Sequence, residues 1–308
     1  MNSTICTLFE GDYHYGVGAL VNSLYKHGFR GVVWAGYRGA LPPWAKDVQQ
    51  CPQYQEFTVA EGCCVRFVPV NTARHLTNYK PDFMVDLWEE YCSLSEALFY
   101  FDPDIVIKCR WSFFEEWALC GVAICGDGHY YQIPSDHPMR CIWKEYAFRK
   151  GYGCQKETNN YYNGGFVGFH HTHKSALRIW QKLLAGLIDE GVDLNQFMPG
   201  DRTLPFFATD QDMLNLMAMV TPDSLSTIGP SGMDFDGTGN IMSHAFGVKP
   251  WRKQFARTAL HGFAPSSADK GFVANSLTPI NLYSQRQRIQ IGLDLRCGAA
   301  IGRLIRKN

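Results

Sequence analysis

Short apolar runs alternate with amphipathic segments along most of this 308-residue chain. The strand-like runs are rich in β-branched and aromatic residues, and several are followed by segments whose apolar positions have helical spacing. This alternation predicts an α/β fold, in which a mixed, mostly parallel sheet is covered by helices on both faces. Ligands of such sheets usually bind beyond the carboxyl ends of the strands.

The predicted elements follow from these runs. The expected strands lie at 4–9, 31–37, 64–70, 97–107, 120–125 and 162–170. The expected helices lie at 19–28, 83–92 and 177–187, and a further helix begins at a capping-box pattern formed by Thr209 and Asp212. Because no linker rich in Pro, Gly or Ser interrupts the chain before about residue 265, we expect one domain over 1–265 and a tail over 266–308.

Composition excludes some classes of partner. Lys plus Arg and Asp plus Glu both number 29, so the global basic field that drives non-specific nucleic-acid binding is absent. The eleven cysteines include no C-x-x-C pair and predict no zinc site. The start, MNSTICTLFEGDYHYG, lacks the features of a signal peptide, and no run approaches the ~20 apolar residues of a membrane span. We therefore expect a cytoplasmic protein without a nucleic-acid partner.

Two carboxylates interrupt the most apolar run, ALFYFDPDIVI at 97–107. Asp102 and Asp104 are two apart, so they can face one ligand, and Pro103 between them cannot donate to a sheet. Burying two neighbouring carboxylates is costly unless a positive group accompanies them. A hard divalent cation such as Mg²⁺ or Mn²⁺ would meet that need, and a solvated Asp-Pro-Asp turn is the alternative.

Three later segments favour the cation. YYNGGFVGF places glycines beside Asn163 where a strand begins, so the backbone there can approach a ligand closely. FATDQDMLN places Asp210 and Gln211 in the first turn of a helix, where the helix dipole alone would also favour an acid. SHAFGVKPWRK supplies His244, a possible metal ligand, and then a Gly and a Lys that could grip a metal-bound diphosphate.

In this order, D-x-D, N-x-G, D-Q-D and H-x-x-G…K-P-W resemble glycosyltransferase family 8, which includes glycogenin and bacterial lipopolysaccharide galactosyltransferases. The opening TLFEGDYHYGVGALVNSL is also similar to that family's first strand and helix, and the resemblance covers about residues 4–253. It implies a GT-A fold, a catalytic domain over 1–265, and retaining transfer of a hexose, galactose or glucose, from a UDP-sugar with Mn²⁺ or Mg²⁺. The acceptor would be a glycan or glycolipid, such as lipopolysaccharide or another surface polysaccharide.

The resemblance also implies a role for each matching residue. The implied metal ligands are Asp102, Asp104 and His244. The implied donor-binding residues are Asp12 near the base or ribose, Tyr15 on the uracil ring, Lys80 and Asp102 near the donor, Asn163 and Gly164 at the sugar, and Gly247 and Lys249 at the diphosphate. The implied catalytic residues are Asp210, which would bind sugar hydroxyls, and Gln211, near the anomeric carbon.

Some alternatives stay open at this point. One residue stands between Gly247 and Lys249 where the family usually has two, and the opening loop is one residue longer than the family's. Retention could come from front-face attack, which the weak nucleophilicity of Gln211 favours, or from double displacement through Asp210. The alternative functions are a sugar nucleotidyltransferase, which normally has a basic Gly-rich loop where this chain has FEGDYHYGVG, and a silent carbohydrate-binding protein on the same fold.

The tail RQRIQIGLDLRCGAAIGRLIRKN, at 286–308, differs in charge from the rest. It holds one acid, Asp294, and six basic residues, which are Arg286, Arg288, Arg296, Arg303, Arg306 and Lys307. Its apolar residues suit either a helix or a strand. The alternatives are a terminal helix packed on the domain and an amphipathic anchor that contacts anionic lipid at the cytoplasmic face of the inner membrane.

Overall fold

The structure is a computed structural model that describes residues 1–129, 132–198, 203–237 and 239–305. The chain forms two compact units, each assembled from separate stretches of sequence. The first unit comprises Met1–Leu8, Pro69–Asp102 and Ser112–Pro230, and the second comprises Phe9–Val68, Pro103–Trp111 and Ser231–Asn308. The boundary expected near residue 265 stays a prediction.

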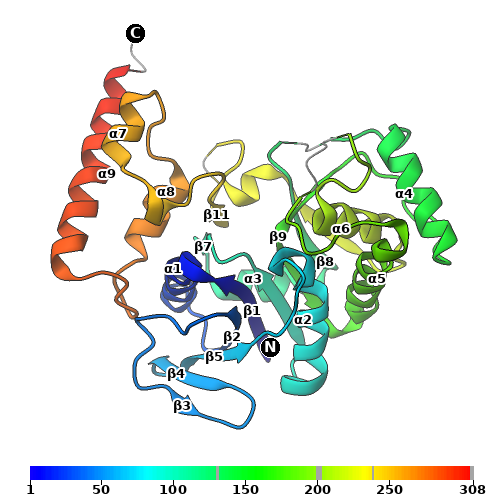
Figure 1. Ribbon diagram of the computed structural model, residues 1–308, viewed down its shortest axis with the longest axis horizontal. Coiled ribbons are helices and arrows are strands. Elements are labelled where there is room, and N and C mark those ends of the chain that lie inside the picture. The colour runs from blue at the N-terminus through cyan, green and yellow to red at the C-terminus, as the bar shows by residue number, and fades with distance from the viewer. Residues whose placement is uncertain (130–131, 199–202, 238, 306–308) are drawn as a thin grey trace. The chain divides into compact units, whose positions relative to one another are not determined.

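The first unit is built on a mixed sheet with the strand order β10-β8-β9-β6-β1 (Figure 1). Strand β1 pairs in parallel with β6 and β8 in parallel with β10, whereas β9 is antiparallel to both β6 and β8. Its strands are β1 (Ser3–Glu10, whose last two residues belong to the second unit), β6 (Ala97–Phe101), β8 (Val122–Gly126), β9 (Tyr162–His170) and β10 (Leu225–Ile228). Both β6 and β8 are buried along their whole length, as continuous apolar runs predict.

The helices of this unit are α2 (Lys80–Asp86), α3 (Trp111–Leu119, whose first residue belongs to the second unit), α4 (Pro138–Arg149), α5 (Lys174–Ala185) and α6 (Thr209–Val220). Helices α2, α5 and α6 contact the sheet, and α4 packs on α6. Helix α5 packs against α2 and α6, and it buries Leu177, Trp180 and Leu184, the face that the sequence predicts. The helix predicted at 83–92 appears as α2 followed by a π-helical turn over Leu87–Tyr91.

The start of α6 corrects the capping-box prediction. The helix does begin at Thr209, but the residue that precedes it, Ala208, has no side-chain cap. The Thr209 hydroxyl instead donates to the carbonyl of Phe206. Only the reverse half of the pattern forms, because the Asp212 carboxylate accepts the N–H of Ala208 at 3.0 Å. A carboxylate in the first turn satisfies an orphan donor there without help from the threonine.

The second unit contains the strand order β2-β5-β4-β3 and a separate antiparallel pair, β7 with β11. Its strands are β2 (Gly31–Arg38), β3 (Gln49–Gln50), β4 (Gln55–Ala60), β5 (Cys63–Pro69, whose last residue belongs to the first unit), β7 (Ile105–Ile107) and β11 (Met242–His244). Its helices are α1 (His14–Lys26), α7 (Phe255–Leu260), α8 (Ser267–Ala274) and α9 (Gln285–Ile305). Helix α1 begins earlier than the predicted 19–28 and packs on β7.

The run predicted as one strand over 97–107 is two strands in two different sheets, β6 and β7. The interruption falls at Asp102-Pro103-Asp104, where the proline lacks an N–H for a ladder. The N–H of Asp102 donates to the carbonyl of Gly165 in the first unit, and the carbonyl of Asp104 accepts from Ala245 in the second unit. The two carboxylates therefore stand at a change of sheet.

The C-terminal region is helical, which resolves the choice between helix and strand. Helix α9 packs along α7 (Figure 1), and Gly298 and Gly302 are its buried positions. In the part of the chain that the structure describes, no helix is both long enough and apolar enough to cross a lipid bilayer. Arg306 and Lys307 lie outside the described residues.

Candidate functional site

In the second unit, the pairing of β7 with β11 brings two predicted metal ligands together. His244 stands opposite Ile105 in this pair, next to Asp104 at the start of β7. The imidazole Nε2 of His244 lies 3.2 Å from Oδ1 of Asp104, and both side chains are almost buried, at 9% and 4% exposed. Two residues that are 140 positions apart in sequence thus share one place because a short antiparallel ladder aligns them.

Lys249 completes this cluster from the turn that follows β11. Its ammonium lies 2.5 Å from Oδ2 of Asp104 and donates to the carbonyl of Ala245 at 3.0 Å. Burial alone would raise the pKa of Asp104, but His244 and Lys249 together hold that pKa well below its usual range. Asp104 is therefore an ionised carboxylate with positive or polarisable neighbours on both oxygens.

Asp102 is tied to this cluster by the chain itself, because only Pro103 separates it from Asp104. Among the described residues, Asp102, Asp104 and His244 form a group of side chains that could hold a metal ion. Two carboxylate oxygens and an imidazole nitrogen are suitable ligands for Mn²⁺ or Mg²⁺, which retain open positions for phosphate oxygens. The donor set therefore fits a divalent cation of this kind.

The predicted nucleotide residues lie at the start of α1, in the same unit as Asp104. A Cβ added to Gly16 would lie 2.1 Å from the carbonyl oxygen of Pro103, so only glycine lets this helix approach the Asp-Pro-Asp turn. Tyr15 stacks on Tyr283, with ring centroids 5.1 Å apart and planes 15° apart. Asp12 accepts a hydrogen bond of 2.6 Å from Nε of Arg252, and this bond lowers the pKa of Asp12.

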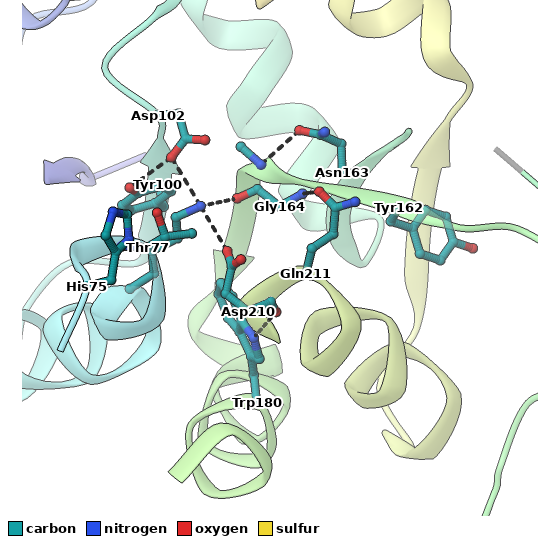
Figure 2. A network of polar contacts seen from close by, with 12 residues as sticks. His75, Thr77, Tyr100, Asp102, Tyr162, Asn163, Gly164, Trp180, Asp210 and Gln211 are labelled. Atoms are coloured by element: carbon teal, nitrogen blue, oxygen red, sulfur yellow. Dashed lines mark hydrogen bonds and ion pairs between the residues drawn. The ribbon is translucent and has the colours of Figure 1, made fainter. Parts of the chain in front are cut away.

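In the first unit, a buried ammonium joins three predicted site residues (Figure 2). Nζ of Lys80 lies 3.1 Å from Asp102 and 3.0 Å from Asp210, and it donates to the carbonyl of Gly164 at 2.9 Å. The Lys80 side chain is only 3% exposed. Burial would lower its pKa, but the two carboxylates raise the pKa of Lys80 above its usual value. Lys80 is therefore a permanent positive charge that fixes both acids.

Asp210 and Gln211 are held by different partners although they are neighbours in α6. Burial raises the pKa of Asp210, and Lys80 opposes that shift. The amide oxygen of Gln211 accepts the N–H of Gly164 at 2.9 Å, and its amide nitrogen donates to Asp127 at 3.3 Å. The carbonyl and N–H of Gly164 thus both bind predicted site residues, so β9 and the start of α6 are fixed against each other.

Asp127 is a site residue that the sequence reasoning missed. It follows β8 directly and is buried, and its Oδ2 accepts from Asn163 at 2.8 Å as well as from Gln211. Asn163 in turn accepts the N–H of Gly165 at 2.9 Å, so its side chain is oriented by the protein on both sides. The sequence marks Asp127 only as a single acid between two glycines after an apolar run, without the second carboxylate that singled out Asp102 and Asp104.

The structure thus gathers the predicted residues into two clusters. Asp104, His244 and Lys249 meet in the second unit, which also holds Asp12, Tyr15 and Gly247, while Lys80, Asp102, Asn163, Gly164, Asp210 and Gln211 meet in the first. The cluster in the first unit can bind and orient polar groups, and Asp104 and His244 of the other cluster belong with Asp102 to the group that could hold a cation. Tyr100 joins the first cluster, because its hydroxyl donates to Asp102 at 3.0 Å.

Comparison with known proteins supports the fold. No family model and no curated protein sequence matches this chain. The solved apo structure of WbbM, a bifunctional glycosyltransferase, is similar with a TM-score of 0.52 and 14% sequence identity. The match covers 95% of this chain and 51% of that chain, so this protein spans about half of that structure. The predicted α/β fold of the GT-A type, with a mixed central sheet flanked by helices, is confirmed, and membership of family 8 stays a prediction.

Proposed function

We propose that this protein is a retaining, metal-dependent hexosyltransferase of the family 8 type. It would move galactose or glucose from a UDP-sugar to a glycan or glycolipid acceptor such as lipopolysaccharide. The observation that carries the proposal is the Asp104–His244 pair beside the Asp-Pro-Asp turn, because a buried carboxylate, an imidazole and a neighbouring carboxylate make a set of Mn²⁺ or Mg²⁺ ligands. The glycosyltransferase fold supports it independently.

Each cluster has a part in the proposed reaction. When bound to Asp102, Asp104 and His244, the cation would supply Lewis-acid stabilisation of the charge that develops on the leaving UDP. Lys249, with Gly247 in the same turn, would hold the diphosphate, since an ammonium placed where negative charge develops favours the transition state. Tyr15 would stack on the uracil ring, and Asp12 would lie near the base or the ribose.

The first cluster would bind the sugar. Lys80 is near the donor in this proposal and keeps Asp102 and Asp210 in place, while Asn163, Gly164 and Asp210 would contact the sugar. Because Asp210 is ion-paired with Lys80, it is a restrained nucleophile, and this pairing favours front-face attack over double displacement. The Gln211 amide, fixed by Gly164 and Asp127, would then lie beside the anomeric carbon without forming a covalent bond.

The experiment is a hydrolysis and transfer assay with UDP-galactose and UDP-glucose, with and without Mn²⁺. Asp104→Asn and His244→Ala should each reduce metal-dependent turnover by at least about 100-fold, a typical loss for a group that stabilises developing charge. Asp189→Asn and His261→Ala, at positions outside both clusters, serve as matched controls. Near-normal turnover by Asp104→Asn would refute the ligand assignment, and formation of UTP from UDP-sugar and pyrophosphate would favour the nucleotidyltransferase instead.

We further propose that α9 contacts anionic lipid at the cytoplasmic face of the inner membrane. The apolar positions that share a helical face, which are Ile289, Leu293, Cys297, Ala300 and Leu304, are exposed rather than packed on α7. The carboxylate of Asp294, the one acidic residue of α9, accepts the backbone N–H groups of Phe255 and Ala256 at the start of α7. An exposed apolar face with arginines nearby suits an anionic bilayer surface.

Vesicle sedimentation tests this second proposal. Replacing Arg288, Arg296 and Arg303 together by Gln should weaken binding to vesicles that contain phosphatidylserine, because each basic group near the surface contributes ~1 kcal/mol. Neutral phosphatidylcholine vesicles are the control. Equal binding of the wild type and the triple variant to both kinds of vesicle would refute the proposal that α9 contacts anionic lipid.

A further inference from the structure

A loop between α8 and α9 lies along one face of α1, and a buried asparagine holds it there. The side-chain nitrogen of Asn22 donates to the carbonyls of Asn275 and Ile280, each at 2.8 Å. The side-chain oxygen of Asn22 accepts the N–H of Ile280 at 2.7 Å. Asn22 is fully buried, so these bonds replace water entirely. Removing one partner of a buried set like this is expensive, and the segment is therefore firmly attached.

Nearer the start of α1, the same loop packs closely against the helix backbone. A Cβ placed on Gly18 would lie 2.3 Å from Cδ2 of Leu282, so glycine at this position allows Leu282 to sit against the helix backbone. Leu282 is itself buried. One turn further toward the N-terminus, Tyr283 stacks on Tyr15.

The three helix positions form one line. Tyr15, Gly18 and Asn22 are spaced i, i+3 and i+7, which places them on the same face of α1. They meet Tyr283, Leu282 and Ile280 in the opposite order, so the segment runs antiparallel to the helix. The ring of Tyr283 is therefore placed by a set of contacts that reaches along two turns of α1.

Tyr283 also contacts a second aromatic ring. Phe272, a buried residue of α8, meets the Tyr283 ring edge-on, with centroids 6.4 Å apart and planes at 82°. The two tyrosine rings are stacked and nearly parallel, so a planar ligand would not bind between them. Tyr15 and Tyr283 both keep partial exposure to solvent.

From this geometry we propose that Tyr283 is a positioning residue for the nucleobase of the donor. It holds the ring plane of Tyr15 fixed before the nucleotide arrives, so that little side-chain freedom is lost on binding. The inference rests on the proposed function, which assigns Tyr15 to the base. It adds that residues beyond 265, assigned by sequence to a separate tail, build part of the nucleotide site.

The experiment measures binding of three ligands to the full-length chain by calorimetry: UMP, UDP with Mn²⁺, and pyrophosphate with Mn²⁺. Tyr283→Ala should weaken UMP and UDP by the same factor, about two- to tenfold from the cost of immobilising one side chain, and leave pyrophosphate unchanged. Tyr283→Phe should bind all three as the wild type does, because it retains the stacked ring. Tyr152→Ala, in the first unit, is the matched control.

Loss confined to the base-bearing ligands separates a positioning role from a structural one. An equal loss for pyrophosphate, or UMP affinity in Tyr283→Ala equal to that of the wild type, would overturn the inference while leaving the proposed function standing. Failure of the wild type to bind UMP or UDP at all would reject both. If Tyr283→Ala does not fold, Tyr283→Leu decides the question, since it fills similar space without a flat ring.

Discussion

Carboxylates in the two units show how the same side chain acquires opposite properties. In the second unit, Asp104 is flanked by His244 and Lys249, and its pKa is held well below the usual value. In the first unit, Asp210 shares the one ammonium of Lys80 with Asp102, and burial raises its pKa. Both carboxylates are buried, so burial does not explain the contrast. The ratio of cations to carboxylates does.

Asp212 extends this comparison to a carboxylate whose hydrogen bonds come from neutral donors. It accepts from the Tyr161 hydroxyl at 2.6 Å and from the Ala208 backbone at 3.0 Å. Burial raises the pKa of Asp212 to about 8. Asp104, Asp210 and Asp212 therefore form a series in which each loss of positive charge favours the protonated acid. Asp104, at one end of the series, is suited to binding a cation, and Asp212, at the other end, is suited to a structural hydrogen bond.

The largest expected effect comes from removing the shared ammonium. Lys80→Met should lower the free energy of unfolding by about 3–5 kcal/mol, because two buried carboxylates then lose their counter-charge. Urea denaturation measures this loss. Adding Asp210→Asn to the Lys80→Met variant should recover part of the loss, and Lys150→Met, which removes an ammonium paired with the exposed Asp189, is the control. A Lys80→Met protein as stable as the wild type would show that the Lys80 ammonium does not compensate the charges of Asp102 and Asp210.

Asp212 gives the next effect, which depends on pH. Because its folded pKa of about 8 exceeds the unfolded value, the folded state retains a proton that the unfolded state releases. The free energy of unfolding should therefore decrease as pH rises from ~4 to ~8, by up to about 1.4 kcal/mol per pH unit from this group. Asp212→Asn should remove this slope. Parallel stability curves for Asp212→Asn and the wild type across that range would contradict the assigned ionisation.

The smallest expected effect has opposite signs for two ligands. Lys249→Met removes a positive charge next to Asp104, so Mn²⁺ alone should bind about three- to tenfold more tightly, which corresponds to about 1 kcal/mol of like-charge repulsion screened as in water. UDP in the presence of saturating Mn²⁺ should bind more weakly, because the diphosphate loses its ammonium. Calorimetry with the two ligands checks both signs. Weaker binding of Mn²⁺ to the variant would show that Lys249 supports the cation site and does not compete with it.

Much of the fold was predictable because it depends on local patterns. The apolar runs predicted β1, β2, β5, β8 and β9 close to their observed bounds, and helical spacing predicted the buried face of α5. The strand at 97–107 was predicted as one element because apolar residues continue through it. Its division into β6 and β7 depends on partners far away in sequence, Gly165 and Ala245.

The candidate site was predictable only in part, for the same reason. Residue type and order identified Asp104, His244 and Lys249, which do meet. Sequence could not identify Asp127, whose role depends on the orientation of two amide side chains. It also could not link Asn22 to Ile280, because that contact spans 258 positions.

Two parts of the C-terminal region, the loop that contacts α1 and the helix α9, can be removed separately by truncation. The contacts made by Ile280, Leu282 and Tyr283 end before α9 begins at Gln285. A truncation after Ser284 would thus spare the ring that supports Tyr15, whereas one after Ala274 would uncover Gly18 and remove all three hydrogen bonds that the Asn22 side chain makes to Asn275 and Ile280. The first truncation therefore tests the role of α9 alone, and the second also tests the support of Tyr15.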